Sequence, residues 1–324
     1  QIAINQVIPI QFDGDCSNCS IEIDGAKSNG TKTRIIPQSS TPPASAFLVS
    51  EDIGNITIKN FDFQGFSGPA IVVQSIHNTR VEISSNSFGQ INPSSQANHT
   101  GITVTDGDRL LIRNNVFGRQ TDNGIELKGS SSNNTIQENL FGVASVTDLA
   151  NFIPGIQNDA INISEQSQST QIIDNIITNT GRNGISIIGG TGHEIGNNRI
   201  FNNQGLGVAI ASLGNNQTQP AQLTGANRIG NAIKLSGTAE TQSQITIYQA
   251  NNSSNPAITP DTQGGEGFEV LQSRFVDSSE DEDPQLGRFT FSVSSSGLIL
   301  GDTLSTIKTL NRNSSGFSNN VVVS

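Results

Sequence analysis

Among the ionisable side chains between residues 122 and 182, five are candidates for acid–base catalysis: Asp122, Glu126, Lys128, Asp159 and Arg182. Hydrolysis of a glycosidic bond requires a protonated acid opposite a carboxylate that acts as base or nucleophile. Elimination requires a base, for which Arg182 with Lys128 is the candidate pair. The competing interpretation is a solvated polar face, because charged side chains usually lie at the surface in contact with water. Both interpretations stay open from the sequence.

Other residue types that serve in catalysis are scarce. The chain has three histidines, His77, His99 and His193, and a single tyrosine, Tyr248, far along the sequence from the five residues above. A histidine- or tyrosine-based mechanism therefore has few candidates.

Carboxylates are also concentrated between residues 277 and 283, where Asp277, Glu280, Asp281 and Asp283 lie close together. Closely spaced oxygen ligands suit Ca²⁺. The EF-hand spacing is absent, however, and a run of charge is equally typical of a solvated loop. We expect no required cofactor, and Ca²⁺ is the ion for which the sequence offers candidate ligands.

The two cysteines, Cys16 and Cys19, are separated by two residues. A redox-active pair needs a βαβ context and a metal site needs further ligands, and neither accompanies them. We predict a local disulfide, with a free pair and a zinc site as the alternatives.

The elements that must position these residues follow from a repeat. A segment that reads small-Ile-x-Val/Ile/Leu recurs about every 23–24 residues, with two longer intervals. Its copies start at Ala46, Ala70, Gly101, Gly124, Ala160, Gly184 and Gly207. Short strands in such regular phase predict coils wound in one direction, each strand pairing in parallel with its equivalent in the next coil. The longer intervals predict insertions at 90–98 and 143–157 that project on the same side.

A second segment, out of phase with the first, reads Ile-x-x-Asn-x-Phe/Ile. Its asparagines are Asn86, Asn115, Asn139, Asn175 and Asn198. Asn tolerates the left-handed conformation of a sharp bend, and its side chain can bond the backbone of the next coil. We expect these residues to stack as a ladder beside a narrow core of Ile, Val and Phe.

Composition restricts the classes of function. The net charge of −11 argues against binding to nucleic acid or to an anionic membrane, since both need a basic face. No apolar run approaches the roughly 18 residues of a membrane span. Apolar residues make up 33% of the chain and charged residues 14%, which favours an elongated fold with a thin core. Because the chain begins with Gln1 and shows no signal peptide, we interpret it as a mature or excised region.

Residues from about 20 to 212 resemble the right-handed parallel β-helix repeats of the pectate-lyase-like superfamily. In that superfamily the small-Ile-x-Val strand forms the floor of the substrate groove. The resemblance implies a binding groove lined by the outward side chains Thr103, Thr105, Asn162, Ser164 and Ser186, together with Glu126 and Lys128.

Within that superfamily, polygalacturonases present Asn-Thr-Asp-Gly, Asp-Asp and Gly-His-Gly on successive groove strands. The corresponding stretches here read Thr121-Asp122-Asn123-Gly124, Asn158-Asp159-Ala160 and Arg182-Asn183-Gly184. Amides thus stand at the first acid, at one of the paired acids and at the histidine. Asp159 and the offset Asp122 leave a rearranged pair open.

The repeat stops at Ala211, and Gly214–Pro220 predicts a linker. Six candidate strands follow, at Ile233–Gly237, Gln244–Gln249, Phe268–Val276, Arg288–Val293, Thr303–Leu310 and Asn320–Val323. Their apolar–polar alternation predicts an antiparallel sandwich. Short motifs such as Leu235–Thr238, Gly264–Gly267 and Asn313–Ser318 resemble the Ig-like module that follows β-helix repeats in bacterial surface proteins. We therefore predict an all-β chain, with a right-handed parallel β-helix and its N-terminal cap at 1–213 and an Ig-like sandwich at 220–324.

Two functions are consistent with these observations. The first is an extracellular or cell-surface structural or adhesive protein, which assembles with itself or binds surface and matrix glycans through the groove. The second is a polysaccharide-active enzyme, a hydrolase or lyase, that acts in the same groove. The amides at the acid positions favour the first.

Overall fold

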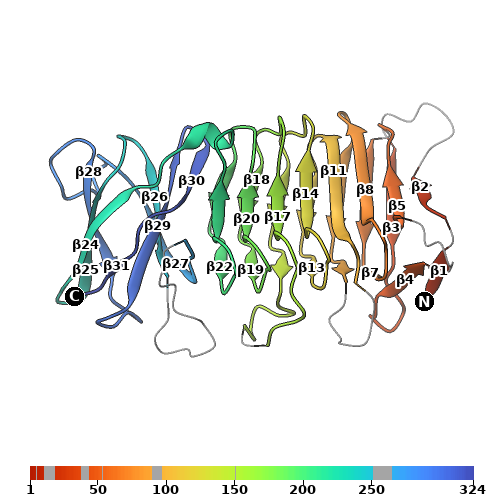
Figure 1. Ribbon diagram of the computed structural model, residues 1–324, viewed down its shortest axis with the longest axis horizontal. Coiled ribbons are helices and arrows are strands. Elements are labelled where there is room, and N and C mark those ends of the chain that lie inside the picture. Colours follow the sequence, from red (N-terminus) through yellow and green to blue (C-terminus); the bar gives the residue numbers. More distant parts are fainter. Residues whose placement is uncertain are drawn as a thin grey trace.

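The computed structural model describes residues 1–4, 6–10, 19–37, 44–52, 54–89, 97–149, 151–250 and 265–324. Within them the chain winds into a right-handed parallel β-helix whose coils stack along one axis, followed by two antiparallel sheets (Figure 1). Three parallel sheets, which we call A, B and C, run the length of the helix, and from β3 onward each coil contributes one strand to each sheet.

Sheet A contains β1 (Ile2–Ile4), β4 (Thr33–Pro37), β7 (Phe61–Phe63), β10 (Ser87–Phe88), β13 (Val116–Phe117), β16 (Leu140–Phe141), β19 (Ile176–Thr178) and β22 (Arg199–Phe201). Sheet B, which carries the small-Ile-x-Val segments, contains β2 (Ile8–Ile10), β5 (Phe47–Val49), β8 (Pro69–Ile76), β11 (Thr100–Gly107), β14 (Ile125–Lys128), β17 (Ile161–Ile163), β20 (Ile185–Ile187) and β23 (Val208–Ile210). Sheet C contains β3 (Ser20–Asp24), β6 (Asn55–Lys59), β9 (Arg80–Ser84), β12 (Leu111–Arg113), β15 (Thr135–Gln137), β18 (Gln171–Ile173) and β21 (Glu194–Gly196).

The core follows from the alternation of side chains along these strands. Equivalent isoleucines of successive coils pair directly, as Ile102 does with Ile125, and both are fully buried. In sheet A the rings of Phe63, Phe88 and Phe117 stack in register, with centroids 5.1 Å and 4.8 Å apart. The predicted thin core is confirmed, because each coil adds only a few inward side chains, such as Ile125 and Leu127 of β14, to the stack.

The asparagine ladder is confirmed as a chain of hydrogen bonds. All five predicted asparagines are fully buried. The side-chain oxygen of Asn139 accepts from the backbone N–H of Asn115, and the side-chain oxygen of Asn175 accepts in the same way from the backbone N–H of Asn139. This arrangement satisfies backbone groups at the bend between sheets C and A that would otherwise be buried without partners.

The left-handed conformation was assigned to the wrong residue. The residues with positive φ are those directly before the ladder, for example Asn114 (54°), Glu138 (55°) and Asp174 (56°). The residue before each ladder asparagine makes the backbone turn. The side chain of the asparagine then points into the coil, where its amide bonds backbone groups of neighbouring coils.

The first insertion, 90–98, lies outside the described residues except for its last two. The second, 143–157, is described apart from residue 150 and projects below the coils, drawn in yellow-green (Figure 1). It is anchored rather than loose: Val143 pairs with Phe152, and Ile153 and Ile156 are buried.

The second part of the chain forms two antiparallel sheets. One contains β24 (Gln222–Ile229), β25 (Ala232–Thr238) and β28 (Arg288–Ser294). The other contains β26 (Gln244–Gln249), β27 (Glu269–Phe275), β29 (Thr303–Leu310), β30 (Asn313–Phe317) and β31 (Val321–Val322). All six predicted strands are present: β26 and β29 have the predicted bounds, and the ends of the other four are shifted by one residue. The sequence did not predict β24 and β30 as strands.

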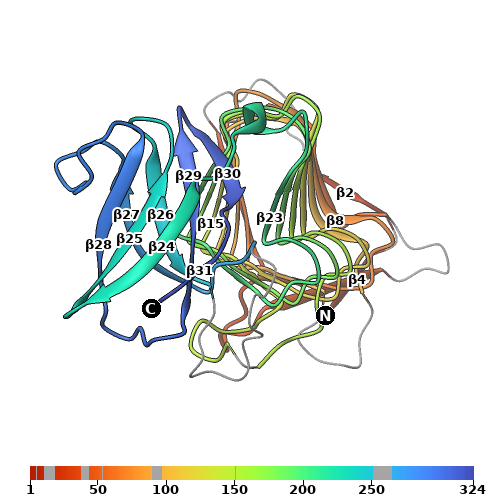
Figure 2. The ribbon, with the colours of Figure 1, turned by 60° about the vertical axis from the view of Figure 1, so that its left-hand side comes forward.

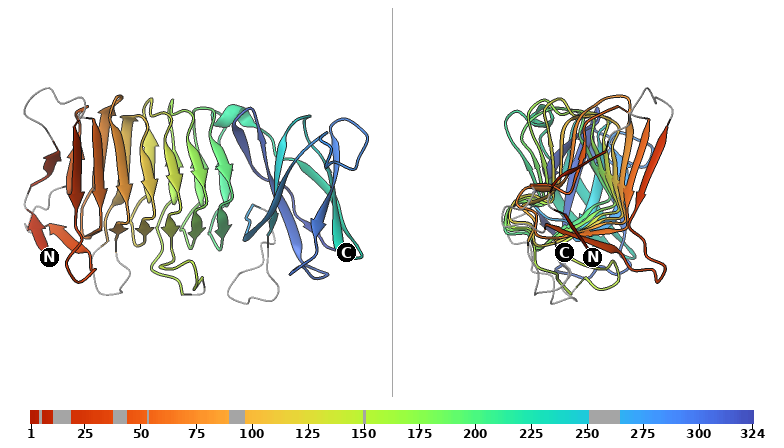
Figure 3. Two further views of the ribbon diagram at one scale, coloured as in Figure 1. Left: turned by 180° about the vertical axis from the view of Figure 1, so that it is seen from behind. Right: turned by 90° about the vertical axis from the view of Figure 1, so that its right-hand side faces the viewer.

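The sandwich continues the hydrogen bonding of the last coil. Ile200 and Gly267 exchange two backbone hydrogen bonds, and Gly207 N–H donates to Gly265. Tyr248, Ile307 and Phe317 of the sandwich belong to the same apolar cluster as the β-helix core. The rest of the sandwich core, with Leu235, Ile247 and Phe291, forms a cluster of its own. The sandwich therefore closes the C-terminal end of the helix with a small part of its apolar surface (Figure 3).

The predicted linker is part of this junction. Within it lies the short 3₁₀ helix η1 (Asn215–Gln217). Asn215 is fully buried, and its side chain bonds the carbonyl oxygens of His193 and Ser314. Gly214–Pro220 does connect the two parts, as a linker would, and Asn215 fixes it to both of them.

Candidate functional site

The outer side of sheet B brings together all five candidate catalytic residues. Figure 2 looks obliquely along the coils and shows sheet B, labelled at β8 and β23, as one wall of the helix and β15 of sheet C as the other. Asp122 and Asp159 precede β14 and β17, Arg182 precedes β20, and Glu126 and Lys128 lie within β14. Asp122 and Arg182 occupy corresponding positions of their coils, two residues before Gly124 and Gly184, whereas Asp159 lies directly before Ala160.

A row of polar side chains runs along the edge of sheet B, two residues before each small residue of the repeat. It consists of His99, Asp122, Asn158 and Arg182, and we call it the edge row. Asn158 Nδ2 donates to Asp122 Oδ1 at 2.9 Å, and Arg182 donates to Asn158 Oδ1 at 3.0 Å. His99 Nδ1 lies 3.8 Å from Asp122 Oδ2. Sequence reasoning missed His99 and Asn158, although counting back from Gly101 and Ala160 identifies both.

The next residue of each coil forms a second ladder, in which Asp159 occupies a position equivalent to Asn123 and Asn183. Asn123 Oδ1 accepts from the backbone N–H of Asp159 at 3.2 Å, and Asp159 Oδ1 accepts from the backbone N–H of Asn183 at 2.9 Å. The second carboxylate oxygen accepts from Asn162 at 3.3 Å. Asp159 is 1% exposed. Its side chain therefore accepts a hydrogen bond from the backbone of the next coil, as the amides Asn123 and Asn183 do in the coils on either side.

The outward side chains of β11 and β14 form a small charged network. Lys128 Nζ donates to Glu126 Oε2 at 3.1 Å, and Thr103 Oγ1 donates to the same oxygen at 3.3 Å. Thr105 pairs in register with Lys128. The charges of Glu126 and Lys128 thus neutralise each other on the surface.

The predicted groove residues differ in accessibility. Thr105 and Ser164 are partly exposed, whereas Thr103, Asn162 and Ser186 are buried at 5%, 8% and 4% exposure. Asn183 Nδ2 donates to Ser186 Oγ. The three buried residues face outward in register, but their neighbours cover them. A ligand on this face would contact Thr105, Ser164 and the charged side chains.

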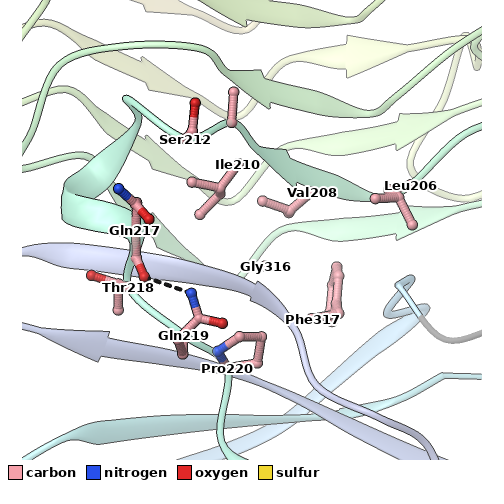
Figure 4. Close-up of a pocket in the computed structure, with 11 residues that line it drawn as sticks. Leu206, Val208, Ile210, Ser212, Gln217, Thr218, Gln219, Pro220, Gly316 and Phe317 are labelled. Atoms are coloured by element: carbon pink, nitrogen blue, oxygen red, sulfur yellow. Dashed lines mark hydrogen bonds between the residues drawn. The ribbon is translucent and has the colours of Figure 1, made fainter.

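A pocket of about 290 Å³ lies at the end of the last coil, between that coil and the sandwich. Figure 4 shows Val208 and Ile210 of β23 on one side, Phe317 of β30 on the other, and Gln217–Pro220 beside them. The pocket exists because the connection to the sandwich crosses the end of sheet B.

The acidic loop directs its carboxylates at its own backbone. Asp281 accepts from the N–H groups of Asp277, Asp283 and Thr290. Glu280 lies 3.6 Å from Arg274, and Asp283 lies 3.2 Å from Arg288. Among the described residues, no three His, Cys, Asp or Glu side chains are arranged to hold a metal ion. Calcium at this loop stays a prediction without a converging ligand set.

Cys19 is disulfide-bonded. Its predicted partner, Cys16, lies outside the described residues, so the pairing with Cys16 stays a prediction.

Two buried polar side chains at the junction are strongly perturbed. Burial lowers the pKa of His193 to about 4, and its Nε2 has no hydrogen-bond partner within the described structure. Burial likewise raises the pKa of Tyr248, whose hydroxyl is also without a partner there. Both lie away from the outer face of sheet B and belong to the packing of the closed end.

Comparison with known proteins identifies the fold and no activity. Residues 10–147 match the family model described as "Right handed beta helix region". No curated protein sequence matches the chain. Solved structures with some similarity are Geobacillus virus E2 ORF18 (12% identity, TM-score 0.30, 94% of this chain and 66% of that one) and tailspike protein 2 of an Escherichia coli O157:H7 bacteriophage (11%, 0.32, 98% and 64%). A third is the A-module of an Azotobacter vinelandii mannuronan C-5 epimerase (12%, 0.23, 59% and 68%).

The chain spans just under two thirds of the first two of these structures. In the described part of the chain, no helix has the length and hydropathy of a membrane span.

Proposed function

We propose that the chain is an extracellular structural or adhesive protein of a surface or matrix, and that the outer face of sheet B binds glycans without turning them over. The observation that carries this proposal is the environment of Asp159. The best-placed carboxylate for catalysis is buried, accepts hydrogen bonds on both oxygens, and does what Asn123 and Asn183 do in the neighbouring coils. A general acid or nucleophile must instead reach the substrate.

The exposed part of the face is suited to sugar hydroxyls. Its amide, hydroxyl and paired charged groups repeat once per coil, about 4.8 Å apart, and are held in place by their neighbours. Such a preorganised surface loses little side-chain entropy on binding. The chain is also expected to assemble with itself, and that expectation is independent of the outer face of sheet B.

The test is a screen of neutral and acidic glycans that records binding and product formation separately. We expect binding without turnover, and we expect Arg182→Gln and Lys128→Gln to weaken it. The control is Gln137→Ala on sheet C, a similar truncation on another face. Product formation by the wild-type chain that Asp159→Asn abolishes would overturn the proposal.

A second candidate function, a polysaccharide-active enzyme, is favoured by the approach of His99 to Asp122. A histidine beside a carboxylate is an arrangement that acid–base catalysis uses, and Glu126 lies in the same coil as Asp122. This candidate predicts turnover that is lost in His99→Gln and kept in Asp159→Asn, which separates it from the first.

A further inference from the structure

A polar trough crosses the outer side of sheet C, on a different wall of the helix from sheet B. Its first part is a depression of about 410 Å³ lined by Asn55, Asn78, Arg80, Arg109, Leu110, Leu111, Asn133 and Thr135. A second depression of about 180 Å³ shares Asn133 and Thr135 with the first and continues to Ser169, Gln171 and Arg312. We call the two together the sheet C trough.

The register explains why these residues line up. Asn55 pairs with Arg80, and Leu111 pairs with Glu82 on one side and with Thr135 on the other. Counting two residues back from Leu111 places Arg109 beside Arg80, with Asn133 in the following coil. The trough therefore presents polar side chains from successive coils, and coils are spaced about 4.8 Å apart.

Two of its cations have no counter-charge. Among the residues that the structure describes, Arg80 and Arg109 make no ion pair or side-chain hydrogen bond, whereas Arg113, on the same sheet, is paired with Glu82 at 2.9 Å. The carboxylate next in sequence, Asp108, accepts from the backbone and hydroxyl of Ser132. In a chain with a net charge of −11, two adjacent unpaired guanidinium groups in a depression form a site for an anion.

We propose that the sheet C trough binds an extended acidic polysaccharide, with its carboxylate or sulfate groups on Arg80 and Arg109. Guanidinium groups bind such anions through paired hydrogen bonds. The amides of Asn55, Asn78 and Asn133 supply donors and acceptors for sugar hydroxyls between the charges. A polymer fits better than a single ion because the donors recur along several coils.

The test measures binding of the full chain to polygalacturonate, sulfated dextran and neutral dextran of matched length. We expect the two charged polymers to bind to the trough. Any binding of neutral dextran should be the same in the wild-type chain and in the trough variants. Arg80→Gln and Arg109→Gln should each weaken binding of the charged polymers about tenfold, with an effect that shrinks as salt is added. Circular dichroism of each variant establishes that it folds.

The matched control is the double variant Lys27→Gln/Arg228→Gln, which removes two exposed positive charges elsewhere. Equal loss in this control and in Arg80→Gln/Arg109→Gln would overturn the proposal, because binding would then follow net charge alone. Preferential binding of single-stranded nucleic acid over both charged polymers would overturn the choice of ligand. Arg80→Gln and Arg109→Gln leave the side chains of sheet B unchanged, so a loss of charged-polymer binding in Arg182→Gln with full binding in the two trough variants would assign the site to sheet B and overturn the trough proposal alone.

Discussion

Replacement of Asn139 by Ala tests whether the asparagine ladder stabilises the β-helix. Asn139 lies in the middle of the ladder, is fully buried, and has ladder partners in both neighbouring coils. Its oxygen accepts from the backbone N–H of Asn115 at 3.0 Å, and its amide donates to the carbonyl of Ile112 at 2.9 Å. Truncation leaves both backbone groups buried without these partners.

The magnitude follows from those two orphaned groups. A buried polar group without a partner costs about 1–3 kcal/mol, so the free energy of unfolding should fall by about 2–6 kcal/mol. That is a large part of the stability of an ordinary domain. The effect should be concentrated in the coils around β15, because coils in a solenoid contact only their neighbours.

The assay is urea unfolding followed by circular dichroism, with hydrogen exchange to locate the effect. The matched control is Gln137→Ala, two residues away on the solvent side of β15, which should change stability by about 0.5 kcal/mol or less. A loss below about 1 kcal/mol in Asn139→Ala, or an equal loss in both variants, would refute the reasoning, since the ladder would then be a consequence of coil stacking and not a cause.

Two further predictions concern the closed end of the helix. The pKa of His193 is about 4 in the folded chain and about 6.5 in the unfolded chain, so the unfolded state binds more protons between these values. Stability contributed by neutral His193 is therefore complete above pH 6.5 and falls by about 3 kcal/mol as the pH drops to 4. His193→Asn replaces the imidazole with an amide that does not titrate, so the loss of unfolding free energy between pH 6.5 and pH 4 should become smaller. An unchanged pH dependence of the unfolding free energy would contradict the burial argument. Tyr248→Phe removes a buried hydroxyl without a partner, so it should preserve stability or raise it by about 1 kcal/mol. A loss of more than 1 kcal/mol in thermal unfolding would show that the hydroxyl has a partner.

The repeat was readable from the sequence because its cause is local. The phase of the isoleucines, the one asparagine per coil and the glycine or alanine at each strand start all repeat at the spacing of one coil. Because the coils stack, residues one period apart in the sequence are neighbours in space. The ladder from Asn86 to Asn198 could thus be predicted residue by residue, whereas the left-handed residue before it could not, because Ser85, Asn114 and Glu138 share no residue type.

The candidate site was predictable in position but not in accessibility. The sequence alone determined that Asp122, Glu126 and Arg182 share one face. Whether Asp159 is a catalytic group or a ladder member depended on which amides surround it, and the burial of Thr103, Asn162 and Ser186 depended on neighbouring coils.

The closed end and the sheet C trough were decided by tertiary structure alone. Nothing in the run Gly214–Pro220 indicates that Asn215 is buried between His193 and Ser314, about a hundred residues further on. Likewise Arg80 and Arg109 are unremarkable in the sequence. They form a site because the winding of the chain places them side by side and leaves both without a carboxylate partner. Periodicity specifies contacts between adjacent coils, and contacts outside that period appear only once the chain is folded.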